Sequence, residues 1–386
     1  MIAVLDDSLL EDSAALAEAD TAGLLRSAAT AGAQLRSVAQ SAEEAGLPSL
    51  SGSRPRALVL LIRPGSSVHA VPLVSALLGP ECPVPVVTSA EAPSWIGPLD
   101  VLVAHTADAA DRELADSVSR AVRRGCEVVL SAPPEGPVVA AGAGSARLLE
   151  PRVPVPPGLD FPRALATVLV TVTALGLLRV DLDELATDLD RELERDHLSH
   201  ESFVNPAKAL ALRLADHTPL LWGTDAPGTA LARYAAATLA AHAAVIAHAT
   251  DVAEAASATG LQRVLASPRQ ADIFHDPFDD PVEATGGGAA LPAPPRILLI
   301  ATEDTDPQAA VMRRAGRDWP SADTLHPVEE IPPGTPNAAL RRAAVLATRF
   351  DLAALYLGLA GAVLGPDLNA DLHTDPDGAR QLSGPA

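Results

Sequence analysis

Lysine, cysteine and aromatic residues are all scarce in this chain of 386 residues. Lys208, in the segment Asn205-Pro206-Ala207-Lys208, is the only lysine. A lysine Schiff base or a Walker-type phosphate loop could therefore exist only there. The two cysteines, Cys82 and Cys126, cannot form a disulfide framework. Aromatic residues make up 3% of the chain, so the core must be built from alanine, valine and leucine.

Positive charge and long hydrophobic runs are also lacking. The formal net charge is -21, which disfavours binding to nucleic acid or to an anionic membrane surface. The most hydrophobic run, residues 164–178, is shorter than the ~20 residues that a membrane span needs. The N-terminus is acidic and lacks the basic region of a signal peptide. We therefore expect a cytoplasmic protein that binds neither nucleic acid nor a membrane.

Short apolar runs alternate with helical patterns in the first part of the chain. Such alternation predicts an α/β fold, with a parallel sheet covered by helices on both faces. The predicted strands are 57–62, 84–87, 101–103, 127–130 and a short edge strand at 147–149, and the predicted helices are 68–78 and 108–124.

The second half repeats the same order of elements. A strand, a loop with glycine and hydroxyl residues, and a helix occur twice, with Gly65-Ser66-Ser67 in one loop and Gly228-Thr229 in the other. We interpret this as two fused α/β units. The predicted elements are helices 162–178, 181–201 and 206–215, a strand at 220–222, an alanine-rich helix to about residue 247, a strand at 296–301 and a buried helix at 337–363.

These patterns divide the chain into five parts. Residues 1–50 are expected to be N-terminal helices, one of them following Asp20-Thr21 with its leucines on one face. The acidic helix 181–201 is interpreted as a solvated outer face. Its end, with His197 and His200, is interpreted as solvated rather than as a metal site. Residues 281–295 are interpreted as a surface loop. The predicted units are 51–157 and 205–365, joined by helices at 158–204 and followed by a frayed tail at 366–386.

Two loops follow strands of the first unit and should lie at the same edge of its sheet. They are 64–67, with Gly65, Ser66 and Ser67, and 104–108, with His105 and Thr106. Ligands of parallel sheets bind at the carboxyl ends of the strands, and a helix N-terminus with hydroxyl groups suits an anion such as phosphate. The plainer alternatives are a serine that caps an ordinary helix and a loop histidine satisfied by its neighbours.

With these segments in view, the chain resembles the SIS-domain (sugar isomerase) family. The resemblance is to the bifunctional phosphoglucose/phosphomannose isomerases and their degenerate actinobacterial relatives, and it extends from about residue 20 to residue 365. It is carried mainly by 58–79, by 100–130 and by Pro157-Gly158-Leu159-Asp160-Phe161-Pro162-Arg163-Ala164. It implies two fused flavodoxin-like SIS units, each a three-layer αβα arrangement with a parallel sheet, and a homodimer.

The resemblance also implies a phosphate site. The family loop Gly-Gly-Ser-Ala corresponds to Gly65-Ser66-Ser67, whose hydroxyls would bind the phosphate of a sugar. In the second loop, normally Ser-Tyr-Ser-Gly-Asn-Thr, only Thr106 keeps a hydroxyl, and Asp108 would repel a phosphate. The family arginine beside the reacting carbons corresponds to Arg163.

Most of the catalytic groups implied by the family do not have a counterpart here. Aldose–ketose isomerisation needs a carboxylate base and a histidine that opens the sugar ring. The segment that matches the family base, residues 237–243, contains no carboxylate, and His275 is the nearest candidate for the histidine. The family lysine near the last helix is absent.

Three functions are therefore considered. The first is a sugar-phosphate-binding protein with impaired catalysis, acting in carbohydrate or sugar-nucleotide metabolism. The second is an active isomerase of mannose 6-phosphate or glucose 6-phosphate in which His242 or His275 replaces the base. The third is a structural partner whose cleft binds nothing. No cofactor or metal is expected in any of them.

Overall fold

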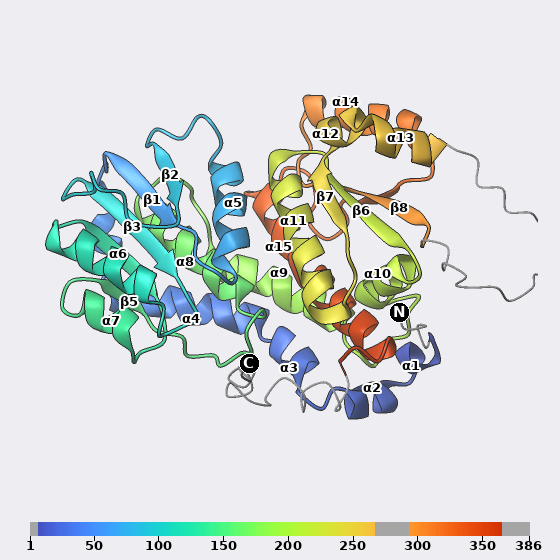
Figure 1. The fold of residues 1–386 in the computed structure, drawn as a ribbon, viewed down its shortest axis with the longest axis horizontal. Helices are drawn as coiled ribbons and strands as arrows, with labels where there is room; N and C mark the ends of the chain where they lie inside the picture. The colour runs from blue at the N-terminus through green and yellow to red at the C-terminus, as the bar shows by residue number, and fades with distance from the viewer. Residues whose placement is uncertain (1–6, 267–292, 365–386) are drawn as a thin grey trace, which may run out of the picture.

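The computed structural model describes residues 7–266 and 293–364, and Figure 1 shows two parallel sheets separated by helices. The first sheet has the order β2-β1-β3-β4-β5 and the second the order β7-β6-β8-β9. The α/β class predicted from the sequence is confirmed. The strands are β1 (Ala57–Leu61), β2 (Val86–Ser89), β3 (Asp100–His105), β4 (Glu127–Ser131), β5 (Arg147–Leu149), β6 (Thr218–Gly223), β7 (His248–Asp251), β8 (Pro295–Ile300) and β9 (Asp323–Leu325).

Helices cover both faces of each sheet. Alternate residues of β1 point to opposite faces, so that Leu58 and Leu60 join a central core while Val59 and Leu61 join an outer one. The first sheet is covered by α4 (Ala31–Glu44), α5 (Ser67–Leu78), α6 (Arg112–Arg123), α7 (Pro137–Gly142) and α8 (Phe161–Ala174). The second is covered by α10 (Pro206–Leu214), α11 (Ala226–Ala243), α12 (Val252–Ser257), α13 (Thr259–Ala266), α14 (Asp306–Asp318) and α15 (Ala338–Ala360).

The two units share one central core. Helix α5 of the first unit packs against α11 of the second, and α11 packs along α15 (Figure 1). Ring contacts cross this junction, because Phe161 stacks on Tyr234 with ring centroids 4.0 Å apart. The remaining elements lie at the N-terminus and between the units: α1 (Asp7–Glu11), α2 (Ser13–Ala19), α3 (Leu24–Ala28), the 3-10 helix at Leu47–Leu50 and α9 (Leu182–Arg195).

Helix α15 is the one helix within the described residues that is long and apolar enough to cross a membrane. Its most apolar window is wholly buried inside the structure. A helix that is hydrophobic on most faces is typical of a protein core as well as of a membrane span. The packing around α15 therefore accounts for its composition.

Several helices predicted from the sequence are shorter in the structure, and two of them differ for a clear structural reason. The helix expected after Asp20-Thr21 is divided into α3 and α4 by a turn at Ala29-Thr30. The alanine-rich helix ends at Ala243 and not near residue 247, because Ala244 adopts a left-handed conformation (φ 52°). The chain then forms β7, which pairs with β6 and was not predicted. Strand pairing here outweighs the helix propensity of the segment.

The prediction that the acidic helix α9 is a solvated outer face was correct only in part. Asp183, Glu184, Asp190 and Glu194 are exposed, but two other carboxylates of the helix are buried. The helix packs against α4 and α15, and the side chains of Asp188 and Glu192 are each 2% exposed. Both are paired with arginines of α15, since Asp188 binds Arg341 and Glu192 binds Arg349. A carboxylate can be buried when a cation and hydrogen bonds compensate for its lost hydration.

Some expectations fall on residues that the structure does not describe. The loop expected at 281–295 lies almost entirely outside the described residues, as do the tail at 366–386 and His275.

Candidate functional site

The two loops predicted from the sequence meet at one edge of the first sheet. Strand β1 lies between β2 and β3, so the connections that follow β1 and β3 depart toward opposite ends of the sheet. This is the topological switch point at which open parallel sheets bind ligands. Gly65, Ser66 and Ser67 follow β1, and Thr106 follows β3, as the sequence led us to expect.

The hydroxyl groups of these loops already have partners within the protein. Ser66 Oγ donates to Asp160 Oδ1 at 2.5 Å. Ser67 Oγ donates to the carbonyl of Arg63 at 2.6 Å. Thr106 Oγ1 accepts from the N–H of Asp108 at 3.0 Å. A phosphate at this edge would have to displace these contacts, and near Ser66 it would also meet the negative charge of Asp160.

A buried chain of polar side chains connects the two loops to the start of α8. His105 Nε2 is hydrogen-bonded to Asp160 Oδ2 at 2.9 Å, and His105 Nδ1 to Ser131 Oγ at 3.0 Å. Burial acts to raise the pKa of Asp160, but the hydrogen bonds from His105 and Ser66 outweigh it and lower that pKa to about 2. Asp160 is therefore an ionised carboxylate, and it lies on the side of the loop where the sequence predicts a phosphate.

A buried ion pair also lies at this edge of the first sheet. Arg63, which follows β1, donates from Nε and Nη2 to the two carboxylate oxygens of Asp111, at 2.8 and 2.9 Å. Both side chains are less than a tenth exposed. This bidentate pair joins the loop after β1 to the N-terminus of α6. It leaves Arg63 unavailable for a ligand.

Arg163 and His242 come from different units and approach the same segment. Arg163 lies in the first turn of α8, is largely buried and donates from Nη2 to the carbonyl of Val153. Burial lowers its pKa. The His242 ring, on α11, lies so near Gly158 that a Cβ added there would be 3.7 Å from Cε1 and Nε2. Burial also lowers the pKa of His242, which favours a neutral imidazole.

The only lysine has a structural role in the described fold. Lys208 Nζ donates to the carbonyls of Leu10, Leu198 and His200 at 2.6 to 2.8 Å. The side chain is almost fully buried. These bonds tie the N-terminal helix α1 to α10. They use all three of its donors.

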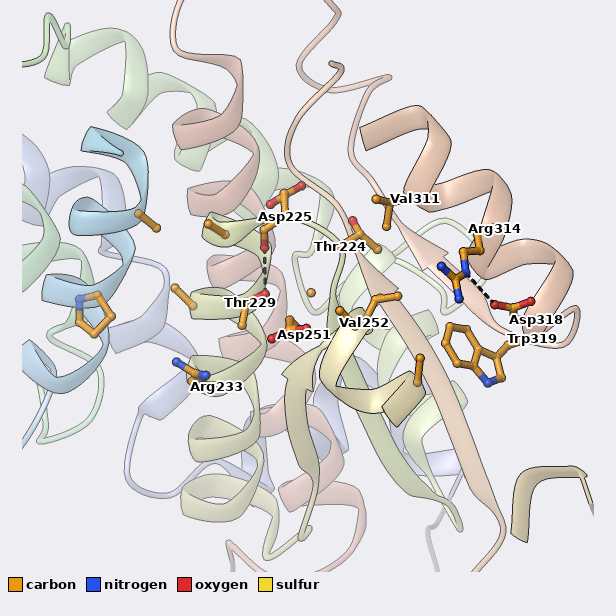
Figure 2. Close-up of a pocket in the computed structure, with 17 residues that line it drawn as sticks. Thr224, Asp225, Thr229, Arg233, Asp251, Val252, Val311, Arg314, Asp318 and Trp319 are labelled. Atoms are coloured by element: carbon orange, nitrogen blue, oxygen red, sulfur yellow. Dashed lines mark hydrogen bonds and ion pairs between the residues drawn. The ribbon is translucent and has the colours of Figure 1, made fainter. Parts of the chain in front are cut away.

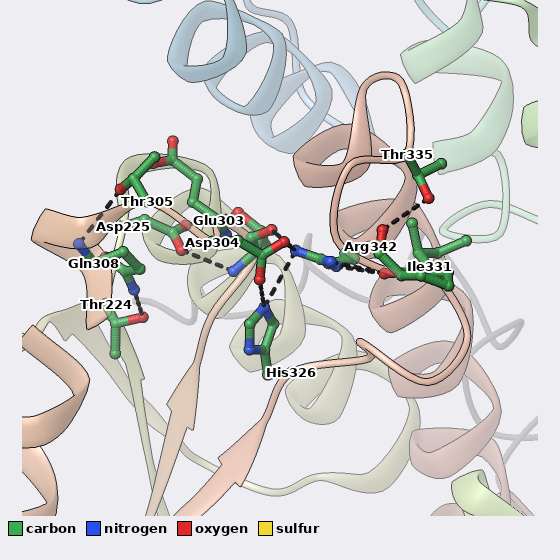
Figure 3. A network of polar contacts seen from close by, with 12 residues as sticks. Thr224, Asp225, Glu303, Asp304, Thr305, Gln308, His326, Ile331, Thr335 and Arg342 are labelled. Atoms are coloured by element: carbon green, nitrogen blue, oxygen red, sulfur yellow. Dashed lines mark hydrogen bonds and ion pairs between the residues drawn. The ribbon is translucent and has the colours of Figure 1, made fainter.

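The switch point of the second sheet is also bridged internally. Asp225, after β6, accepts from the N–H and Oγ1 of Thr302, at 2.7 and 2.8 Å, and from the N–H of Gly228 at 2.7 Å. The fully buried Arg342 donates to the carbonyl of Thr302 at 3.0 Å. It also donates to Asp304 at 2.5 Å (Figure 3). These contacts fix the loop after β8.

An open cavity of about 690 Å³ lies beside this bridge. Figure 2 shows Arg233 on one side of it, Arg314, Asp318 and Trp319 on the other, and Thr229 and Asp251 between them. Pro72 and Ala76 of α5 extend the wall into the first unit. The remaining lining residues are Gly223, Thr224, Asp225, Ala226, Ala230, Val252, Ala253, Ala256 and Val311.

The polar side chains of the cavity differ in whether they form hydrogen bonds or ion pairs with other residues. Arg314 Nε is paired with Asp318 Oδ2 at 3.3 Å. Asp251 Oδ1 accepts from the N–H of Glu254 at 2.8 Å. Arg233 is exposed and forms no hydrogen bond or ion pair with any residue that the structure describes. Sequence reasoning missed this cavity, because α14 was not predicted and nothing in the sequence distinguishes Arg233 from other arginines.

Comparisons with known proteins agree with this architecture. Residues 203–363 match the family model of the bacterial phospho-glucose isomerase C-terminal SIS domain. No curated protein matches the chain.

Solved structures with the same fold are known. A hypothetical protein from Thermus thermophilus is 14% identical, with a TM-score of 0.62 over 95% of this chain and 94% of that one. The C-terminal domain of glucosamine-fructose-6-phosphate aminotransferase from Francisella tularensis is 9% identical, with a TM-score of 0.57 over 88% and 96%. Tagatose-6-phosphate ketose/aldose isomerase from Escherichia coli is 11% identical, with a TM-score of 0.52 over 87% and 90%.

Proposed function

Because this chain is a SIS-domain protein, we propose that it binds a phosphosugar and does not isomerise it. The family match and the fold support the first half of this proposal. A cytoplasmic homodimer acting in carbohydrate or sugar-nucleotide metabolism is part of the same proposal. The second half rests on the groups that the structure makes available for proton transfer.

The observation that carries the loss of isomerase activity is the engagement of the polar groups at the first sheet. An isomerase needs a carboxylate that can take a proton from carbon and return it to the neighbouring carbon. Asp160 is the carboxylate beside Ser66 and Arg163, and His105 and Ser66 hold it ionised with a pKa of about 2. A carboxylate with so low a pKa is a weak base. Lys208 is bound to three carbonyls and cannot take part.

The test combines a binding measurement with an activity measurement on the purified chain. Melting curves are recorded with fructose 6-phosphate, mannose 6-phosphate and glucose 6-phosphate at millimolar concentration. A ligand at 100 times its dissociation constant stabilises the folded state by about 2.7 kcal/mol. We expect a shift of the melting temperature with at least one sugar phosphate, and no interconversion of the sugars. Turnover would overturn the proposal, and no shift with any of them would favour a structural protein.

One observation favours an active isomerase as a second candidate. The His242 ring lies beside Gly158, which belongs to the same segment as Arg163. Burial lowers the pKa of His242, so its imidazole is neutral and can accept a proton. Under this alternative, turnover is found and is lost in His242→Ala. His275→Ala is the parallel variant for the other candidate base.

The sequence-based phosphate site stays a prediction. It consists of Gly65, Ser66, Ser67 and Thr106, with Arg163 beside them. Ligand binding that is lost in both Ser66→Ala and Arg163→Ala would support this site.

A further inference from the structure

We infer that the phosphosugar is bound in the cavity of the second unit, with its phosphate on Arg233 and its hydroxyls on Asp251 and the Arg314–Asp318 pair. This inference rests on the proposed function and names a different site from the one that the sequence predicts. The cavity defined above by its lining residues is called the Arg233 cavity from here on.

The size and position of the Arg233 cavity suit a small ligand. Its volume of about 690 Å³ lies within the range of roughly 300–1,000 Å³ that is typical of small-molecule sites. It is located at the carboxyl ends of β6 and β7, where Gly223 and Asp251 end their strands. Ligands of open parallel sheets bind at this edge.

Arg233 is the group best placed to bind the phosphate. The chain has 49 acidic against 28 basic residues, yet no acidic partner is found for Arg233 among the residues that the structure describes. Its guanidinium is therefore free to form charge-assisted hydrogen bonds with phosphate oxygens, which the planar fork of arginine matches. Thr229 is one turn earlier on α11, so both residues face the cavity (Figure 2).

The wall of the cavity opposite Arg233 carries hydrogen-bond donors and acceptors for the hydroxyls of a sugar. Sugar hydroxyls both donate and accept hydrogen bonds, and the Arg314–Asp318 pair offers a donor and an acceptor side by side. Asp251 uses one carboxylate oxygen for its helix cap and keeps acceptor capacity on the other. Small apolar side chains, among them Ala230, Val252 and Val311, and the ring of Trp319 line the space between.

The carboxylates also limit which anions can bind. Asp225, Asp251 and Asp318 all line the cavity, and their negative charge opposes a bare anion. A ligand gains from this site only if it brings hydroxyl donors to the carboxylates together with a phosphate for Arg233. We therefore expect a sugar phosphate to bind more tightly than either the unphosphorylated sugar or inorganic phosphate.

The experiment measures the dissociation constants of fructose 6-phosphate, mannose 6-phosphate, glucose 6-phosphate, the parent sugars and inorganic phosphate by titration calorimetry on the full chain. Arg233→Ala should weaken sugar-phosphate binding by about tenfold or more, as expected when a hydrogen-bonded charge partner is removed. The matched control is Arg213→Ala, which removes an exposed arginine of α10 that does not line the cavity. It should leave the affinity unchanged.

A second group of variants separates this inference from the proposed function. Sugar-phosphate affinity that is unchanged in Arg233→Ala but lost in Ser66→Ala would overturn the inference and leave the function standing, with the ligand at the first sheet. Inorganic phosphate binding as tightly as the sugar phosphates would also overturn it. Absence of sugar-phosphate binding by the unmodified chain would overturn both this inference and the proposed function. Melting curves without ligand show that each variant is folded.

Discussion

The carboxyl edges of the two sheets have the same topology but different surroundings. In both units the first strand lies between the second and third, which creates a switch point. At the first sheet this crevice is occupied by the protein's own side chains, chiefly Asp160 and the Arg63–Asp111 pair. At the second sheet Asp225 bridges the loops, but a cavity of about 690 Å³ remains beside it. The position of a ligand site therefore depends on which side chains fill the crevice, as well as on topology.

Two arginines, one in each unit, illustrate the difference between the two edges. Arg63 and Arg233 each belong to the connection that follows the first strand of its unit. Arg63 is buried and satisfied by two carboxylates, Asp111 and Glu113. Arg233 is exposed at the cavity and has no partner in the described part of the chain. The same residue type therefore stabilises the fold at one edge and is available for recognition at the other.

Among the variants that test this comparison, Arg63→Ala is expected to cause the largest loss of stability. The substitution leaves the largely buried carboxylate of Asp111 without its bidentate partner. Breaking a buried ion pair in this way costs about 3–5 kcal/mol, measured as the free energy of unfolding in urea. Arg112→Ala, at an exposed arginine next to Asp111, is the control and should change it by less than about 0.5 kcal/mol. Similar values for both variants would show that the first edge does not depend on the pair.

The contact between α11 and α15 of the second unit provides a pH-dependent test. Burial raises the pKa of Asp351 to about 7, although it accepts a hydrogen bond from Tyr234 of α11. In the unfolded chain the pKa of an aspartate is about 3.9, so the folded state holds the proton more tightly. The stability that this group contributes is complete below about pH 4 and is lost as pH rises to about 7.

The measurement compares the unfolding free energy of the unmodified chain and Asp351→Asn across this range. The difference between the two should shift in favour of the variant from pH 4 to pH 7 and then level off. Asn does not titrate, and it keeps an acceptor for Tyr234. A difference that does not change with pH would contradict the assignment.

A smaller effect is expected from Ser66→Ala. Its hydroxyl donates to the ionised Asp160, and loss of a hydrogen bond to a charged group costs about 1.5–3 kcal/mol. If the ligand binds in the Arg233 cavity, sugar-phosphate affinity should stay the same. Ser75→Ala is a useful control, because that hydroxyl donates to a backbone carbonyl of the same helix. Loss of affinity in Ser66→Ala alone would return the ligand to the first sheet.

The smallest expected effect on stability is that of Arg233→Ala. An exposed side chain without a partner contributes within about 0.5 kcal/mol to the free energy of unfolding. The variant should therefore melt like the unmodified chain without ligand and differ from it only when a sugar phosphate is present. A large loss of stability would show that Arg233 has a structural role and would weaken the contrast with Arg63.

The sequence by itself determined the class of fold and most of its elements. The apolar runs of β1, β3, β4, β6 and β8 identify strands because a strand buried on both faces has no polar positions to alternate with. Even the short edge strand β5 was predicted, as was the buried character of α15. The strands β7 and β9 were missed, since each is short and only partly apolar and is defined by the strand that it pairs with.

Only the tertiary structure decided which polar groups are free. His105, Asp160 and Ser66 are separated by many residues in the chain, and their contacts arise where β3, the start of α8 and the loop after β1 converge. The same is true of Asp188 and Glu192 of α9, which the helical pattern places on a solvated helix but which are buried against arginines of α15. Hydrogen bonds and ion pairs depend on distances of about 3 Å, which the spacing of residues along a chain does not specify. The sequence could therefore indicate the sheet edges at which a ligand is expected, while the packing determined that a cavity remains beside the second sheet.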